Sequence, residues 1–314
     1  MDFPGNLNAA VARFVDNERD LRGGSQALTA AYKAGKNSNH ISLGAYMATR
    51  VPATFAANQR VIAELHALRP GFAPNSVLDV GAGPGTGTWA ALSEWPEISE
   101  VTQFEKLKVF AELANALNLQ SNLPALAGAE VVLGDLLKLE ARRKSDLVIA
   151  SYVLAELPMA EIPAAAESLW QCTDDVLLLI EPGTPAGFAR LRLVRDRLLG
   201  AGGHVVAPCT HQLACPMMGG DWCHFKVRVQ RSRAHMHAKN AEVPFEDEAF
   251  SYLVLQRQVS QQPGGRVVAP VAINKVAVTF RLCTATGFQE VAVASRDKPA
   301  YKRAKKMAWG DLWE

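Results

Sequence analysis

Several features that are common in exported and membrane proteins are missing from this chain. No apolar run reaches the roughly 18 residues that a membrane-spanning helix needs, so the sequence predicts no membrane partner. The opening stretch, MDFPGNLNAAVARFVDNERD, lacks the basic and then apolar segments that mark a secretory signal. Five cysteines in 314 residues are too few for a secreted disulfide scaffold. These absences predict a cytoplasmic protein, in which clustered cysteines bind metal or carry out chemistry.

The chain also lacks a strong charge excess, because its net charge is only +2. The charge is unevenly distributed, however: from Gly203 onward, 15 Lys and Arg stand against 9 Asp and Glu. Two basic runs dominate this part, KVRVQRSRAHMHAK at 226–239 and RDKPAYKRAKKMAW at 296–309. Such runs are either solvated faces or, where aromatic residues interrupt them, surfaces for RNA.

The hydrophobic pattern divides the chain into four parts. Residues 1–72 have apolar residues at the spacing of helices and predict a helical N-terminal domain. In residues 73–203, short apolar strands alternate with helices, which predicts an α/β domain with a doubly wound parallel sheet. The alternation then stops. We expect 204–265 to be a cysteine-rich metal-binding insertion, and 266–314 to supply closing strands of the sheet and a basic tail.

The most informative motif is VLDVGAGPGTGTW at residues 77–89. It follows the first predicted strand of the α/β part and opens a helix, which is the context that a nucleotide-binding turn requires. Glycines at 81, 83 and 85 allow the backbone to turn tightly and to approach a ligand. Glu105, at the end of the next strand, can accept hydrogen bonds from ribose hydroxyls.

Two interpretations of this motif compete. A dinucleotide fold has G-x-G-x-x-G, whereas this chain has G-x-G-x-G with Asp79 two residues before the first glycine. That pattern resembles the class I methyltransferases, which have a Rossmann-like sheet and bind S-adenosylmethionine. The resemblance implies that Glu105 holds the ribose, that Asp135 faces the adenine amino group, and that the methionine end lies on Asp79, Gly81, Ala82, Gly83 and Gly85.

The segment where methyltransferases carry their chemistry follows the fourth strand and reads DLVIASYVLAELP at 146–158. The Asn/Asp-Pro-Pro-aromatic turn of amine methylation is absent, and no cysteine nucleophile for carbon methylation occupies the strand end. Ser151, Tyr152 and Glu156 are the candidate catalytic residues. Each also has a purely structural interpretation, since Tyr152 could pack and Glu156 could start a helix.

Three cysteines lie close together in CTHQLACPMMGGDWCHF at 209–225, and a fourth follows at 283. The spacing of Cys209, Cys215 and Cys223 contains no short C-x2–4-C hook, which structural zinc sites usually have. Wider spacings suit an iron–sulfur cluster, while zinc, a disulfide framework and unrelated cysteines remain alternatives. Cys172, at a helix-to-strand joint, is interpreted as a small buried hydrophobe.

Cys209, Cys215, DWCHF (221–225), RLC (281–283) and the closing WGDLW (309–313) together resemble one family. These are the ribosomal small-subunit methyltransferase-like proteins, bacterial relatives of the mitochondrial assembly factor called methyltransferase-like protein seventeen. The resemblance implies S-adenosylmethionine binding, docking on small-subunit ribosomal RNA, and a [4Fe–4S] cluster on Cys209, Cys215, Cys223 and Cys283.

Two functions follow as hypotheses. In one, the protein is an S-adenosylmethionine-dependent methyltransferase of small-subunit rRNA. In the other, it is a non-catalytic assembly factor that uses the fold and the metal module to bind RNA. A small-molecule methyltransferase with a zinc ribbon is a third alternative, which the basic C-terminal third disfavours. An RNA partner makes us expect a monomer apart from the ribosome.

Overall fold

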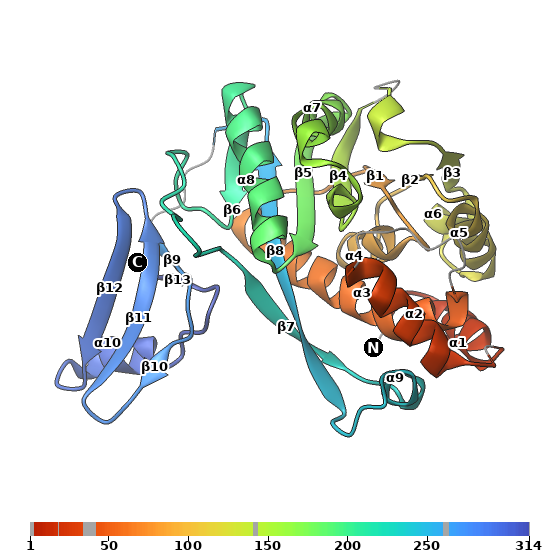
Figure 1. The fold of residues 1–314 in the computed structure, drawn as a ribbon. Helices are drawn as coiled ribbons and strands as arrows, with labels where there is room; N and C mark the ends of the chain where they lie inside the picture. Colours follow the sequence, from red (N-terminus) through yellow and green to blue (C-terminus); the bar gives the residue numbers. More distant parts are fainter. Residues whose placement is uncertain (1–2, 18, 34–41, 141–143, 260–263, 314) are drawn as a thin grey trace.

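The computed structural model describes residues 3–313 except 18, 34–41, 141–143 and 260–263. The segment GKNSNHIS at 35–42, whose composition predicts a loop, lies outside the described residues except for Ser42. Three helices come first: α1 (Leu7–Asp16), α2 (Leu21–Lys33) and α3 (Leu43–Leu68). A large sheet with its own helices follows, and a second sheet lies beside it near the C-terminus (Figure 1). No helix in the described part of the chain has both the length and the apolar character needed to cross a membrane.

The main sheet has eight strands within the described residues: β1 (Ser76–Val80), β2 (Glu100–Glu105), β3 (Glu130–Leu133), β4 (Ser145–Ser151), β5 (Thr173–Pro182), β6 (His204–Ala207), β7 (Phe225–Gln230) and β8 (Phe245–Gln256). Their order is β3-β2-β1-β4-β5-β8-β6, and β7 pairs with β8. The first five strands are parallel neighbours, whereas β8 runs antiparallel between β5 and β6. The predicted doubly wound sheet is thus confirmed, in a class I methyltransferase-like arrangement.

Helices cover both faces of this sheet (Figure 1). Side chains alternate along each strand, so Leu147 and Ile149 face one hydrophobic core while Val148 and Ala150 face the other. The first core receives α3, α4 (Thr86–Glu94) and α5 (Lys108–Gln120). The second receives α7 (Ile162–Gln171) and α8 (Pro185–Gly200). Burial on both faces explains why these strands are continuous apolar runs in the sequence.

The predicted N-terminal helices are present and share the core of the sheet. Phe55 of α3 and Trp89 of α4 are fully buried in the same cluster as Leu7 of α1. The helix α3 is 26 residues long, begins at a Ser42 cap and contains Pro52. It therefore brings one face of the N-terminal part against the sheet along much of its length.

The expectation for residues 204–314 is wrong in one respect. The strands that close the main sheet are β6, β7 and β8, inside the predicted insertion, and α9 (Arg233–Lys239) lies between β7 and β8. The later strands form a separate sheet with its own small core: β9 (Gly265–Val267), β10 (Ala272–Ile273), β11 (Ala277–Thr284), β12 (Gly287–Ala294) and β13 (Leu312–Trp313). The sequence of β11 contains a signal for this separate sheet, because its residues alternate between buried and less buried, as in a sheet with one solvated face.

The remaining short elements are α6 (Pro124–Ala127), α10 (Lys298–Ala304) and three 3₁₀ helices at Leu136–Lys138, Leu154–Glu156 and Met159–Glu161. The 3₁₀ helix at Leu154–Glu156 directly follows the fourth strand of the sheet. It therefore shapes the segment in which the sequence placed the candidate catalytic residues.

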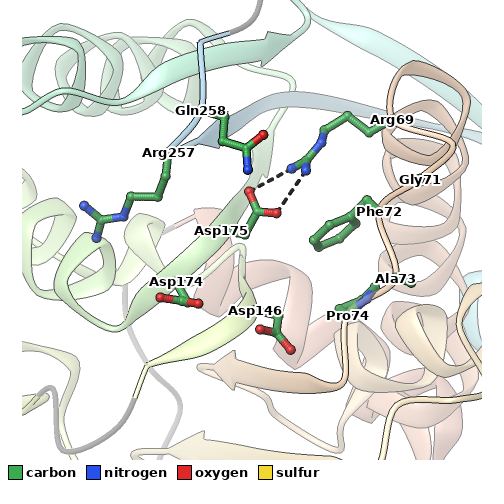
Figure 2. Close-up of a pocket in the computed structure, with 10 residues that line it drawn as sticks. All are labelled: Arg69, Gly71, Phe72, Ala73, Pro74, Asp146, Asp174, Asp175, Arg257 and Gln258. Atoms are coloured by element: carbon green, nitrogen blue, oxygen red, sulfur yellow. Dashed lines mark hydrogen bonds and ion pairs between the residues drawn. The ribbon is translucent and has the colours of Figure 1, made fainter.

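A cavity of about 350 Å³ lies at the amino ends of the parallel strands (Figure 2). Arg69, at the end of α3, makes two hydrogen bonds to Asp175 of β5, at 2.8 and 2.9 Å. Asp146 accepts hydrogen bonds from the amides of Asn75 and Ser76. These acids hold the end of α3 and the start of β1 against the sheet. Ligands of such folds bind at the opposite, carboxyl ends of the strands.

Candidate functional site

The glycine turn after β1 has the conformation that its sequence predicts. Gly81, Gly83 and Gly85 all have positive φ, at 67°, 55° and 101°. A Cβ on Gly81 would lie 2.4 Å from Val153, and one on Gly85 would lie 2.4 Å from the side-chain nitrogen of Gln103. At Gly83, in contrast, the nearest atom would be the Tyr46 hydroxyl, at 3.6 Å. The turn is therefore packed tightly at its two ends and open at its centre.

Asp79 of β1 is buried beneath this turn and lies next to the start of α4. Its Oδ2 accepts hydrogen bonds from the amide and the hydroxyl of Thr88, at 2.8 and 2.9 Å. Burial raises the pKa of Asp79 to about 6; the hydrogen bonds from Thr88 lower it and the nearby Glu105 raises it. The carboxyl group thus fixes the first turn of α4 while remaining part of the cavity wall.

Glu105 ends β2, as predicted, and connects two loops. One of its oxygens accepts from the Gly83 amide at 2.8 Å, and the other accepts from the Leu107 amide at 2.7 Å. Burial raises the pKa of Glu105, and these amide hydrogen bonds lower it. Glu105 therefore holds the open centre of the glycine turn in place.

Asp135 follows β3 and caps the 3₁₀ helix at Leu136–Lys138. Its Oδ2 lies 2.7 Å from Nζ of Lys106, and this hydrogen bond holds the pKa of Asp135 below its usual value. Asp135 is thus an ionised acid at the rim of the site, already paired with a lysine that the sequence analysis did not select.

One cavity of about 750 Å³ joins these residues to the candidate catalytic ones. It lies at the carboxyl ends of the parallel strands, where ligands of this fold class bind. All the residues predicted for the cofactor and catalytic sites line this cavity, except Gly85. They are Asp79, Gly81, Ala82, Gly83, Glu105, Asp135, Ser151, Tyr152 and Glu156. The fold therefore brings the residues predicted from these motifs to one place.

The candidate catalytic residues have different surroundings. Ser151 donates its hydroxyl proton to Oδ1 of the fully buried Asn58 of α3, at 2.8 Å. Tyr152 has a φ of 64°, which is strained for a residue other than glycine, and its hydroxyl donates to Glu248 at 3.1 Å. Glu156 is exposed at the edge of the cavity. Backbone strain of this kind is concentrated at functional sites, so Tyr152 is the strongest of the three candidates.

Several cavity residues were missed by the sequence analysis. They come from elements far apart in the chain: Tyr46 and Arg50 from α3, Arg190 from α8, Lys239 from α9 and Glu248 from β8. Arg190 pairs with the fully buried Glu181 at 2.6 Å. Burial raises the pKa of Glu181 to about 7, against the lowering effect of Arg190. No local pattern marks these residues, since only the tertiary packing brings them to the cavity.

The pH dependence of stability tests the buried state of Asp79. Because its pKa in the folded protein is above the usual 3.8, the folded state holds this proton more tightly, and stability falls as pH rises from about 4 to about 6. We expect wild type to lose about 3 kcal/mol relative to Asp79→Asn over this range, with no further relative loss at higher pH. Urea unfolding of both proteins measures this difference, and parallel pH profiles would contradict the assignment.

The four cysteines of the predicted metal site are free, and they influence one another. Burial, together with the nearby Cys209 and Cys215, raises the pKa of the Cys283 thiol to about 12. Burial also raises the pKa of Cys223, to which Cys209, Cys283 and Cys215 add. The four thiols thus lie within electrostatic range of each other. Among the described residues, however, no group of three His, Cys, Asp or Glu side chains has the arrangement of a bound metal ion.

Two buried arginines lie beside these thiols. Arg195 of α8 donates to the carbonyl oxygens of His211 and Leu213, and Arg266 of β9 donates to the carbonyl of Pro208. Burial raises the pKa of Cys209, whereas both arginines lower it. His211 lies with its Nε2 4.0 Å from Sγ of Cys283. Each guanidinium therefore fixes the backbone of the cysteine segment and supplies positive charge next to the sulfur atoms.

Two other expectations concern neighbouring residues. Cys172 is a buried hydrophobe, as predicted, with 1% of its surface exposed. The basic run at 226–239, which includes Lys226, Arg228, Arg231 and Arg233, is partly neutralised. Across the β7–β8 ribbon, Arg228 pairs with Asp247 and Arg231 pairs with Glu246. The acidic run of β8 therefore compensates two of the four cations.

Comparison with known proteins places the chain in a family. A family model described as mitochondrial small ribosomal subunit Rsm22 matches residues 41–314. The chain belongs to this Rsm22 family. Human "Ribosome assembly protein METTL17, mitochondrial" is 30% identical over 286 residues, which cover 85% of this chain and 61% of that protein. The resemblance stated from the cysteine motifs is thereby confirmed.

A second relative is "Rsm22-cox11 tandem protein 2, mitochondrial" of Schizosaccharomyces pombe, 24% identical over 365 residues, covering 96% of this chain and 48% of that protein. The chain thus spans about half to three fifths of the length of these curated Rsm22 relatives. Both names specify mitochondria, so the cytoplasmic location of this chain stays a prediction. Among solved structures, magnesium protoporphyrin IX methyltransferase from Synechocystis with bound SAH is similar at 16% identity and a TM-score of 0.45, covering 75% of this chain and 95% of that one.

Proposed function

We propose that this Rsm22-family protein binds S-adenosylmethionine and acts on small-subunit ribosomal RNA during assembly of the small ribosomal subunit. The observation that carries the proposal is the cavity at the carboxyl ends of the strands, which joins an open glycine turn to buried acids. Family membership supports the ribosomal part. The alternative is an assembly factor that keeps this cavity but transfers no methyl group.

The residues present fit S-adenosylmethionine. Asp79 and the turn at Gly83 would hold its methionine end, Glu105 its ribose, and Asp135 its adenine amino group. The backbone is open at Gly83, where a Cβ would fill the approach to the cavity. When bound, the sulfonium supplies an electrophilic methyl group, and its positive charge suits the buried carboxylates of this end. Ser151, Tyr152 and Glu156 would orient the acceptor.

Gly83→Arg tests the cofactor site. An arginine at this position projects into the cavity and has an unfavourable φ, so we expect affinity for S-adenosylhomocysteine to fall by about a hundredfold or more. Gly71→Arg is the matched control, because a Cβ at Gly71 meets no atom within 4 Å and the residue belongs to the other cavity. Calorimetric titration measures both, and equal affinity in wild type and Gly83→Arg would refute the site.

Enzyme and assembly factor are separated by mass spectrometry of rRNA from a deletion strain. A methyl mark that disappears on deletion, and returns with wild type but not with Gly83→Arg, identifies an enzyme. Defective small subunits with unchanged marks identify a non-catalytic factor.

We also propose that Cys209, Cys215, Cys223 and Cys283 hold a [4Fe–4S] cluster, with a zinc ion as the alternative. The mutual influence of the four thiols supports a common site. A second observation is Arg266, which is 3% exposed and whose Nη2 has no hydrogen-bond partner among the described residues. A buried donor without a partner is costly, and an anionic cluster with sulfide acceptors would provide one. Such a cluster would order a segment that has few apolar residues of its own.

A further inference from the structure

On the side opposite the glycine turn, the wall of the large cavity is basic. Arg50 comes from α3, Arg190 from α8 and Lys239 from the last turn of α9. The short helix α9 packs on α2 and α3, and Arg22 of α2 donates to Asn240 at its end, at 3.0 Å. Lys239 is therefore held at the cavity by the N-terminal helices and by the β7–β8 ribbon, where His235 of α9 lies 3.3 Å from Glu246.

The opposite wall is acidic, so the cavity is polarised. Asp79, Glu105 and Asp135 lie around the glycine turn, where the proposed cofactor carries its sulfonium. On the basic side, Arg50 lies 3.6 Å from Glu248, while Arg190 is paired with Glu181. Across the described residues, Lys239 makes no ion pair or hydrogen bond. Glu246 and Glu248 lie within electrostatic range of Lys239 without forming an ion pair with it, so its ammonium group is available to an anionic ligand.

Tyr152 lies between the two walls. Its strained backbone turns the ring toward β8, where the hydroxyl is held by Glu248 and the guanidinium of Arg50 lies 5.8 Å from the ring centroid. An aromatic ring beside a carboxylate and cations offers stacking and hydrogen bonds to a heterocycle next to contacts for its phosphate. Burial lowers the pKa of Lys239, as does Arg50, whereas Glu246 and Glu248 raise it.

We propose that this basic wall is an acceptor subsite that takes one nucleotide of single-stranded RNA, with Lys239 and Arg50 holding its phosphate and Tyr152 facing its base. The inference rests on the proposed function, because it names the class of molecule that enters beside the cofactor. The polarity of the cavity then orients both ligands: the cationic one lies against the acids and the anionic one against α9.

Binding of nucleoside 5′-monophosphates and of the matching nucleosides to the full chain tests the subsite. A charge-assisted hydrogen bond from Lys239 predicts that wild type binds the monophosphate about tenfold more tightly than the nucleoside. Lys239→Met is expected to abolish this preference, Lys239→Arg to retain it, and Lys275→Met, on the second sheet, to leave it unchanged. Thermal unfolding of each variant verifies that it is folded.

The subsite would be overturned by a wild type that does not prefer the monophosphate, or by a preference that survives in Lys239→Met. Inorganic phosphate that competes as well as the nucleotide would also overturn it, because the base would then contribute nothing. Titration of S-adenosylhomocysteine in parallel separates this inference from the proposed function. If wild type binds S-adenosylhomocysteine without discriminating nucleotides, the subsite fails and the cofactor site stands. If it discriminates nucleotides without binding S-adenosylhomocysteine, the cofactor proposal fails.

Discussion

Cys209→Ser, Cys215→Ser, Cys223→Ser or Cys283→Ser is expected to remove the proposed metal site and RNA affinity together, whereas Cys172→Ser keeps both. Serine is a poor ligand for iron and zinc, and a four-thiolate site cannot tolerate the loss of one thiolate without losing most of its affinity. Metal binding supplies folding energy to such a segment, so the segment around 209–223 should also become accessible to proteases. Cys172 is the matched control because it is a free, buried cysteine outside the proposed metal site.

The measurement is anaerobic purification followed by the visible spectrum and the iron, sulfide and zinc content. A broad absorption near roughly 400 nm, with about four iron and four sulfide per chain, identifies the cluster. One zinc and no colour would support the zinc alternative and make the segment a zinc module. A metal-free serine variant that binds RNA as tightly as wild type would show that RNA binding does not depend on the metal.

Loss of the Arg266 guanidinium is expected to have the largest effect on stability outside the cysteine site. Arg266 lies 2.5 Å from Oε1 of Glu64 and donates to the carbonyls of Pro208 and Gly310. Tyr252 donates its hydroxyl to the same carboxylate, at 2.8 Å. Arg266→Met leaves the buried Glu64 with a reduced counter-charge, so the free energy of unfolding should fall by about 3–5 kcal/mol.

Two further variants make this prediction specific. Glu64→Leu combined with Arg266→Met removes both charges, and we expect it to recover part of the loss. Lys108→Met breaks an exposed pair with Glu112 on α5 and should cost less than about 0.5 kcal/mol. Urea unfolding of the four proteins provides the comparison. An Arg266→Met variant no less stable than Lys108→Met would show that the buried pair is unimportant for stability.

The sequence predicted the parts of the site that depend on neighbouring residues. The turn at Gly81–Gly85 and the acid Glu105 at the end of β2 follow from the order strand, turn, helix, strand, and Gly81, Gly83 and Glu105 line the cavity. Arg50, Lys239 and Glu248 could not be found in this way. They reach the cavity only because α3 crosses the sheet and β8 inserts between β5 and β6, and both events depend on packing between distant segments.

The closing strands show a second limit of sequence reasoning. The run SYLVLQ of β8 is buried on both faces and has the pattern of a central strand, yet the neighbouring cysteines suggested an insertion. In contrast, the alternating pattern of β11 indicates a sheet with one solvated face. Burial pattern was therefore the better guide to which strands close the main sheet.

The proline in α3 has a mechanical consequence. Tyr46 and Arg50, near the start of this helix, line the large cavity, whereas Glu64 and Arg69, near its end, hold Arg266 and Asp175. At a rise of about 1.5 Å per residue, the helix extends roughly 35 Å from Tyr46 to Arg69. Pro52 has no amide hydrogen to donate to the carbonyl four residues earlier, so the backbone ladder is one bond short just after Arg50. The helix α3 is thus anchored at its C-terminal end to the second sheet and to the amino ends of the parallel strands. It bends most easily near Pro52, next to the helical turn that lines the cavity.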